Sequence, residues 1–186
     1  GGNLTAFGKE VQDGMRQMAR DIPINVNELN KIGEAAGQLG VKSKDIMQFT
    51  RTIADMGVAT DLTTEQAATG MAQFANIINN KAGPQFEMLG AVIVELGNKG
   101  ASTEKQILDF GLRLAAAGKL AGMSESDILA LGSALASVGI EAEAGGSAFS
   151  LVIQTMTEAV KTGNDKLAIF AHTAGFEGPD AAQKFA

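Results

Sequence analysis

The sequence contains no cysteine, no tryptophan, no tyrosine and a single histidine among its 186 residues. The absence of cysteine excludes disulfides, thiolate zinc sites and cysteine nucleophiles, and it leaves the redox compartment open. All nine aromatic residues are phenylalanine. Aromatic stacking and histidine-based catalysis therefore have few possible carriers in this chain.

Positive charge and long apolar runs are also scarce. The chain carries 15 Lys and Arg residues against 21 Asp and Glu residues, which gives a formal net charge of −6. Because a basic excess supplies most of the affinity for nucleic-acid phosphates, we expect no specific nucleic-acid partner. No apolar run approaches the ~18 residues of a membrane span, so we expect no such span. With 45% hydrophobic residues, the chain is too apolar for disorder and favours a globular domain with one core.

Apolar residues recur at helical spacing along almost the whole chain. The same +3, +4, +3 steps appear in four stripes: Ile46/Phe49/Ile53/Met56, Phe86/Leu89/Ile93/Leu96, Ile107/Phe110/Leu114/Ala117 and Ile128/Leu131/Leu135/Val138. No strand-like alternation competes with them. Single-stripe helices joined by short turns must bury their stripes against antiparallel neighbours. We therefore predict an all-α fold, an array or bundle of short antiparallel helical hairpins with no β-sheet.

Local start and stop signals divide these helices. The expected N-caps are Ser43, Thr63, Ser102 and Ser124, with Gln66 completing a capping box after Thr63, and Asn25-Val26-Asn27 opens a further helix. The expected C′ glycines are Gly40, Gly57, Gly118 and Gly139. The helices are therefore expected to be short and frequently interrupted.

Three regions follow from these signals. Residues 1–24 form an amphipathic helix that ends before Pro23 and is loosely attached, residues 25–178 form the core module, and residues 179–186 begin a further, truncated helix. The chain starts with Gly1-Gly2-Asn3, without an initiator methionine, a basic region or an apolar leader segment. We therefore expect no signal peptide and a piece of a longer protein.

Two spacings suggest internal repetition. Ile107, Ile128 and Phe149 lie 21 residues apart, and so do Phe110, Leu131 and Val152, and Leu114, Leu135 and Met156. A second similarity has an offset of 82 residues. The segment that begins at Asp45 and the segment that begins at Asp127 carry similar residues at matching positions. Both spacings fit either a true duplication or convergence on helix–turn–helix sequence patterns.

Glycine is abundant, with 23 residues, several of them inside the expected helices: Gly70, Gly111, Gly132, Gly145 and Gly146. Each costs about 1 kcal/mol relative to alanine within a helix. Glycine at such positions serves either close helix approach or a hinge. We favour close packing.

The sequence contains fragments of catalytic and phosphate-binding motifs, but none of these motifs is complete. The segment Gly145-Gly146-Ser147-Ala148-Phe149 begins like a nucleophile elbow but has Phe where the second Gly belongs, and Gly118-Lys119-Leu120 lacks the hydroxyl of a phosphate loop. His172 has no partner suggested by the sequence, and the acidic residues cluster at helix starts, where they complement the dipole. We predict no catalytic, cofactor-binding or metal-ligating residues, no cofactor and no enzymatic activity.

A resemblance supplies a function. Three stretches resemble the core region of the tail tape measure protein family of long-tailed bacteriophages: residues 39–68, residues 96–107 with 115–123, and Ala130-Leu131-Gly132-Ser133-Ala134-Leu135-Ala136-Ser137-Val138-Gly139-Ile140-Glu141-Ala142-Glu143-Ala144-Gly145-Gly146. The likeness extends over about residues 25–178 and lies in the order and spacing of helix segments rather than in a catalytic motif.

The resemblance implies a structural protein of a phage or prophage, made in the cytoplasm of the bacterial host and built into the virion tail, where it sets tail length during assembly. It implies contacts with tail tube, tail tip and tail assembly chaperone proteins, and with copies of itself. No catalytic residues carry over. Family members are usually many hundreds of residues long, so we expect this chain to be a compact module of such a protein rather than the ruler itself.

Two alternatives belong to other classes. Tape measure proteins can carry cell-wall-degrading domains, and a helical module could be such an accessory domain. A free-standing bacterial helical repeat adaptor would instead present a groove for peptides.

Overall fold

The computed structural model describes residues 2–80, 82–163, 165–177 and 181–185. Within these ranges the chain is all-α, as predicted, with ten α-helices, one 3-10 turn and no strand. In chain order the elements are α1 (Gly2–Asp21), α2 (Val26–Gln38), η1 (Ser43–Asp45), α3 (Ile46–Ala59), α4 (Thr64–Ile78), α5 (Gly83–Lys99), α6 (Glu104–Leu120), α7 (Glu125–Ser137), α8 (Ala142–Thr162), α9 (Asp165–Thr173) and α10 (Ala181–Phe185).

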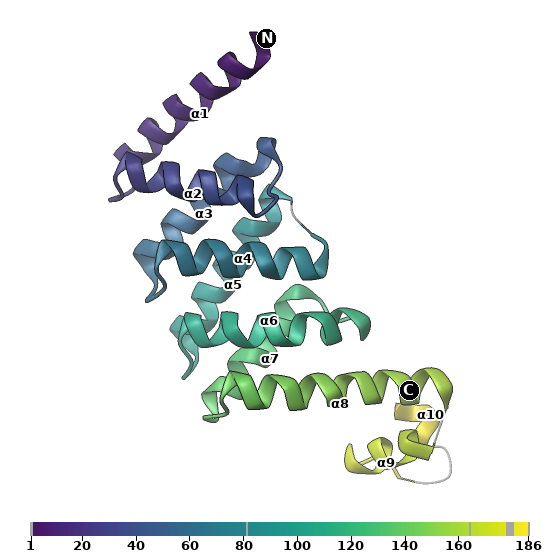
Figure 1. Cartoon of the computed structure of the whole chain (residues 1–186). Helices are drawn as coiled ribbons and strands as arrows, with labels where there is room; N and C mark the ends of the chain where they lie inside the picture. The colour runs from purple at the N-terminus through teal and green to yellow at the C-terminus, as the bar shows by residue number, and fades with distance from the viewer. Residues whose placement is uncertain (1, 81, 164, 178–180, 186) are drawn as a thin grey trace.

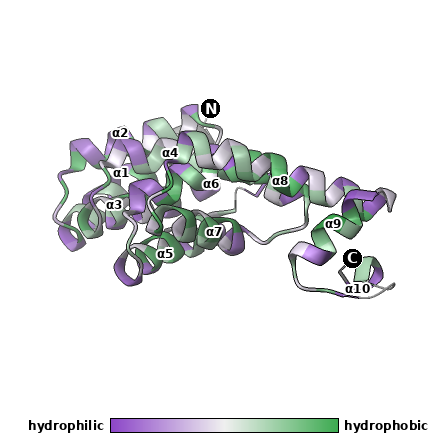
Figure 2. Cartoon of the chain, turned by 90° about the horizontal axis from the view of Figure 1, so that it is seen from below, coloured by the Kyte–Doolittle hydropathy of each residue, from purple (hydrophilic) through white to green (hydrophobic). Residues whose placement is uncertain are grey.

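The helices stack in two layers (Figure 1). One layer contains α2, α4, α6 and α8, each packed against the next, and the other contains α3, α5 and α7. Consecutive helices cross between the layers through short turns and run antiparallel (Figure 1). The predicted array of antiparallel helical hairpins is therefore confirmed. Seen along the stack, hydrophilic residues are frequent at the turns between helices, and α7 is largely hydrophobic (Figure 2).

The core is continuous between the two layers. Its largest fully buried side chains include Phe49, Phe74, Phe86 and Phe110, one from each of four consecutive helices. The rings of Phe49 and Phe86 pack edge to face, with centroids 4.7 Å apart and planes at 83°. Burying one such side chain contributes about 1.5–3 kcal/mol. These phenylalanines therefore tie successive helices into one body.

Both ends of the chain depart from the two-layer pattern. The C-terminal half of α1 buries Met15 and Met18 in the common core, and its N-terminal half projects away from the stack (Figure 1). At the other end, α9 packs on α8 and α10 packs on α9. The division into residues 1–24, 25–178 and 179–186 stays a prediction, and residues 178–180 and 186 lie outside the described residues.

Most of the predicted helix starts are confirmed. Thr63 caps α4 in a reciprocal capping box. The backbone N–H of Gln66 donates to the Thr63 hydroxyl, and the backbone N–H of Thr63 donates to the side-chain Oε1 of Gln66. Asn25 caps α2 and Ser124 caps α7 through the same kind of side-chain acceptor. The prediction for Ser43 was wrong: Ser43 is the first residue of the short 3-10 turn η1, whose N-cap is Lys42, and Asp45 holds the N-cap position of α3, neither of them with a side-chain cap.

The prediction for Ser102 was wrong. Thr103 caps α6, again in a capping box with Gln106, while Ser102 is buried one residue earlier. The Ser102 hydroxyl lies 2.8 Å from the hydroxyl of Ser133 on α7. The Ser102 side chain, predicted to cap the helix, is instead engaged by Ser133, a residue distant in the sequence.

Two of the four predicted stop glycines are confirmed. Gly40 and Gly139 follow α2 and α7 with φ of 82° and 78°, the left-handed conformation that glycine adopts without steric cost. Gly57 and Gly118 were wrongly assigned, because both lie inside helices that continue past them. A Cβ at Gly57 would lie 2.7 Å from Cγ2 of Thr64, and one at Gly118 would lie 2.6 Å from Cγ1 of Ile128. These two glycines therefore make room for neighbouring side chains.

Most of the other helical glycines also mark close approaches, although Gly37 on α2 has nothing within 4 Å of an added Cβ. These approaches favour a role in close helix packing over a role as hinges. An added Cβ would collide with a side chain of a neighbouring helix in each of these pairs: Gly70 with Leu108, Gly111 with Leu129, Gly132 with Phe110 and Gly146 with Arg113. Because the layers depend on these contacts, glycine offsets its helix-propensity cost through tighter packing.

The 21-residue register continues into a progressively more exposed environment. Phe110 on α6 is 1% exposed, Leu131 on α7 is half-buried, and Val152 on α8 is 43% exposed. The α6 side chain lies beneath later helices of the stack, whereas α8 is the last long helix of its layer. The repeated sequence pattern therefore leads to repeated burial at Ile107 and Ile128 and at Leu114 and Leu135, but not at the equivalent positions of α8.

Candidate functional site

The motif fragments of the sequence have structural roles. Gly145 and Gly146 are buried in the first turns of α8, and the Ser147 hydroxyl donates to the carbonyl of Glu143 one turn earlier. Lys119 lies in the last turn of α6 and donates from Nζ to the carbonyl of Ile77, near the end of α4. A cation at a helix C-terminus is favourable because the unpaired carbonyls carry partial negative charge.

His172 is exposed in the last turn of α9, and it lines none of the grooves considered below. Asp127, in the first turn of α7, keeps a local role and accepts a hydrogen bond from the Ser124 hydroxyl. Asp45 and Glu125, also at helix starts, instead accept hydrogen bonds from distant residues, the Gly83 backbone N–H and Nδ2 of Asn80. Among the described residues, no group of three or more acidic or histidine side chains could hold a metal ion.

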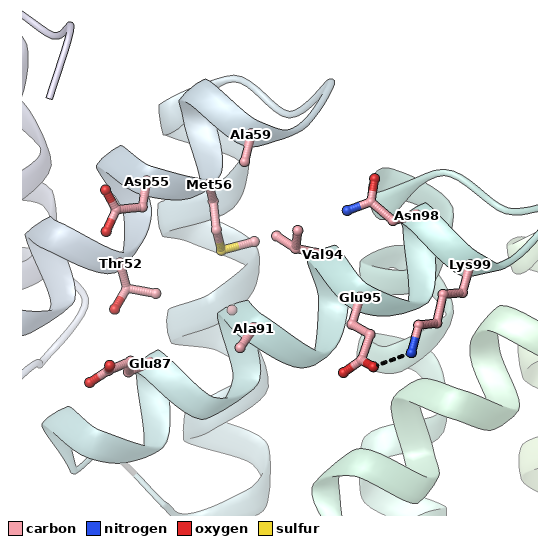
Figure 3. A pocket seen from close by; sticks show the side chains of 11 residues that line it. Thr52, Asp55, Met56, Ala59, Glu87, Ala91, Val94, Glu95, Asn98 and Lys99 are labelled. Carbon is pink, nitrogen blue, oxygen red and sulfur yellow. Dashed lines mark hydrogen bonds and ion pairs between the residues drawn. The ribbon is translucent and has the colours of Figure 1, made fainter.

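A concave surface lies between α3 and α5, in the layer opposite α4 (Figure 3). This α3–α5 groove has a volume of about 570 Å³. Its floor is apolar and small: Met56 and Val94 point toward each other across it, and Ala59 and Ala91 are exposed along it. A surface of this kind can receive an apolar ridge from another molecule.

Three contacts fix the register of the two helices that form the groove. At the start of α5, the Gly83 amide N–H donates to Oδ1 of the buried Asp45. One turn later, Nε2 of Gln48 donates to Oε2 of Glu87 at 2.9 Å.

Farther along, a Cβ at Gly90 would lie 2.7 Å from Cγ2 of Thr52, so α3 and α5 approach closely beneath the groove. These partners advance together along the chain, so α3 and α5 lie parallel with an offset of 38 or 39 residues.

The rim of the groove is acidic. Asp55 and Glu87 lie near one end, and Glu95, Asn98 and Lys99 lie toward the other (Figure 3). Oε1 of Glu95 is 2.6 Å from Nζ of Lys99. The hydrogen bond from the ammonium, followed by its positive charge, lowers the pKa of Glu95, and the same hydrogen bond, followed by the negative charge of the carboxylate, raises the pKa of Lys99. The groove lining thus presents three carboxylates and one ammonium group, and Nε of Arg51, beside the groove, lies 3.2 Å from Oδ2 of Asp55.

The geometry suits binding more than catalysis. A general acid of a cell-wall hydrolase needs a carboxyl group whose pKa is raised, so that it holds a proton at neutral pH. Glu95 has the opposite shift, because its partner is a cation. An ionised rim around an apolar floor instead favours recognition of a complementary surface.

A second exposed apolar surface lies on α8. Leu151 is 65% exposed, and Val152 and Val160 are also exposed, although all three belong to a helix that packs on α6. Met156 and Ile153 border a second hollow together with Leu120 at the end of α6 and Met123 in the turn that follows it. This surface is more apolar in character than the α3–α5 groove and has only Lys161 as a charged lining residue.

Sequence reasoning did not identify the α3–α5 groove. Its residues come from two segments about 40 positions apart, and their pairing depends on which helices share a layer. The signal available in the sequence was the spacing Glu87, Ala91, Val94, Glu95 and Asn98, which places small and acidic residues on one outward face of a helix.

No helix of the described chain is both long and apolar enough to cross a membrane. Comparison with known proteins gives a consistent family. Residues 12–185 match the model of the family described as phage-related minor tail protein. The chain is also 26% identical, over 169 residues, to a probable tape measure protein of Halomonas phage phiHAP-1.

That alignment covers 87% of this chain and 19% of the relative, so the chain spans about a fifth of the relative's length. No solved structure matches the chain. The family match covers nearly all of the helical stack, from the middle of α1 into α10. The chain therefore belongs to the phage-related minor tail protein family and is a distant homologue of tape measure proteins.

Proposed function

We propose that this chain is a compact helical module of a tape measure protein that takes part in tail assembly and in tail-length determination through contacts with other tail proteins. The observation that carries the proposal is the match of residues 12–185 to the minor tail protein family, together with the similarity to a probable tape measure protein. On this proposal the module is made in the bacterial cytoplasm and becomes part of the virion tail.

The shape of the stack supports a contact role over a measuring role. A continuous helix of 186 residues would span about 280 Å at 1.5 Å per residue. The longest helix here, α8, has 21 residues, which corresponds to about 32 Å. Because the chain folds back on itself at every turn, it is too short to measure a tail by its own length.

The surfaces supply the means of contact. The α3–α5 groove and the apolar face of α8 both expose side chains that a partner could cover. Partners of the proposed kind are tail tube, tail tip and tail assembly chaperone proteins, and further copies of the chain.

Purified chain, mixed in turn with each of these tail proteins and analysed by size-exclusion chromatography with light scattering, tests the proposal. We expect a complex with at least one tail protein. A strict monomer that binds none of them would contradict the proposal, and clearing of a peptidoglycan suspension by the purified chain would favour the cell-wall-degrading alternative.

A further inference from the structure

We propose that the α3–α5 groove is the docking site for a basic amphipathic helix of a partner protein. The inference rests on the proposed contact role for its biological setting, and it names the chemistry of the partner that this surface fits. It is carried by three features of the groove: its length, its small apolar floor and its acidic rim.

The length of the groove corresponds to a short helix. From Glu87 to Asn98 the lining residues of α5 extend over eleven residue steps, about 17 Å or three helical turns. The two walls are parallel helices, so the space between them is a straight channel rather than a closed cavity. A third helix laid along such a channel packs its ridge of side chains between the two walls.

The floor accepts close approach of a backbone. Gly90 is buried beneath the channel, and Ala59 and Ala91 on either side of it carry only methyl groups. Met56 and Val94 provide apolar contact at the centre (Figure 3). Methionine adapts its shape to the partner, which suits a surface that is filled only when a complex forms. The face of the partner that enters the channel is therefore apolar.

The rim determines the charge of the partner. Asp55, Glu87 and Glu95 stand on both walls, and Lys99 is the single cation of the lining. Asp55 pairs with Arg51 beside the groove at 3.2 Å and Glu95 pairs with Lys99 at 2.6 Å, so the rim keeps a net negative charge and, among the described residues, Glu87 is its carboxylate without an ion pair. The whole chain is also acidic, with a net charge of −6, so long-range attraction acts in the same direction as the local rim. Lysine or arginine residues flanking the apolar face of the partner would pair with Glu87 and join the exposed pairs that Asp55 and Glu95 form with Arg51 and Lys99. Nucleic acid is disfavoured by the same charges.

The experiment measures binding of two fluorescein-labelled synthetic peptides to the 186-residue chain by fluorescence anisotropy. Both peptides have 18 residues with Leu and Ala at i, i+3, i+4 and i+7 spacing. One carries Lys and Arg beside this stripe, and the other carries Glu at the same positions. We expect saturable binding of the cationic peptide, weakening with added salt, and at least about tenfold weaker binding of the anionic peptide.

Matched variants locate the site. Glu87→Lys with Glu95→Lys reverses two rim charges, and Glu34→Lys with Glu158→Lys makes the same change in net charge on exposed positions of α2 and α8. We expect the rim pair of substitutions to weaken binding of the cationic peptide at least about tenfold, and the distant pair to weaken that binding less than about threefold. Circular dichroism and urea midpoints identify any variant that fails to fold. If the rim pair fails to fold, Ala91→Gln replaces it, because this substitution narrows the channel without changing its charge.

The contradicting results are distinct. Equal weakening by both pairs, equal binding of both peptides, or no saturable binding of either peptide would overturn the assignment. A dimer of the chain that dissociates in the rim variant would place a second copy in the groove and would also overturn it. Peptide binding with the expected pattern, but no complex with any tail protein, would contradict the proposed function and leave the chemistry of the groove in place.

Discussion

Gly132 of α7 lies directly against Phe110 of α6: a Cβ built on Gly132 would be 2.8 Å from the Cβ of Phe110 and 3.4 Å from the carbonyl oxygen of Ile107. The first of these atoms lies at the base of a buried side chain and the second belongs to the backbone, so neither can move without shifting a helix. This contact sets the distance between α6 and α7, at the centre of the stack.

We predict that Gly132→Ala destabilises the protein by about 1–3 kcal/mol, because overpacking outweighs the gain in helix propensity. The control is Gly37→Ala on α2, where an added Cβ would have nothing within 4 Å. That substitution should stabilise the protein by about 0.5–1 kcal/mol. Urea unfolding of both variants provides the measurement, and stabilisation by Gly132→Ala would show that the two helices can separate freely.

The buried hydroxyl pair between α6 and α7 gives a second prediction. Ser102→Ala leaves the Ser133 hydroxyl buried without its partner at 2.8 Å, so we expect a cost of about 1–3 kcal/mol. Ser102→Ala combined with Ser133→Ala removes both polar groups and should cost less than the sum of the single changes. Additive costs in this double-mutant cycle would mean that the two hydroxyls do not interact.

A third prediction uses the 21-residue register as an internal control. Leu114, Leu135 and Met156 occupy equivalent positions. Leu114 is 0% exposed, Leu135 is 6% exposed, and Met156 is only half-buried. We expect Leu114→Ala to cost about 2–5 kcal/mol and Met156→Ala to cost less than half as much, because a side chain at the edge of the stack leaves a smaller cavity. Thermal or urea unfolding of Leu114→Ala, Leu135→Ala and Met156→Ala should give losses that decrease in this order, and equal losses at α6 and α8 would refute the graded burial.

The ion pair at the rim of the groove predicts a titration. The Lys99 ammonium holds the pKa of Glu95 below its ordinary value of 4.5, so the pair contributes fully above that value and its contribution is lost as pH falls through the depressed pKa. Lys99→Gln should therefore move the titration midpoint of the Glu95 carboxyl upward, toward 4.5, in carbon-detected NMR.

The pKa of Lys99 is raised, so its pH dependence has the opposite sign. The contribution of Lys99 to stability is fully present below the ordinary lysine pKa and is lost as pH rises through the raised pKa. Because both side chains are exposed, we expect the global stability to change little. A midpoint that stays in place after Lys99→Gln would show that the two groups do not pair in solution.

Local signals in the sequence were sufficient wherever a structural feature depends on neighbouring residues. Thr63 and Gln66 form the predicted capping box because both partners lie within one turn. The apolar stripe Ile107, Phe110, Leu114 and Ala117 is buried because its spacing matches the helix period. The all-α hairpin array follows from stripes and turns of this kind.

Features that depend on distant residues could not be predicted in this way. Gly57 and Gly118 resemble helix stops in sequence, yet neighbouring helices fill the space beside them and the helices continue. Val138 ends a predicted core stripe but is 73% exposed, because it lies at the C-terminal end of α7. The α3–α5 groove requires Thr52 to pair with Gly90, a relationship that only the packing of the layers defines.

Tail length provides the most direct test of the central claim, that this segment is a compact contact module within a tape measure protein. The measurement is the distribution of tail lengths, by electron microscopy, in phage whose tape measure gene lacks the codons for these 186 residues. We predict fewer completed tails, with those that form not shortened in proportion to the deletion. Normal numbers of tails, uniformly shorter by the ~280 Å that a continuous helix of this length would span, would contradict the claim and show that the segment measures length in an extended form.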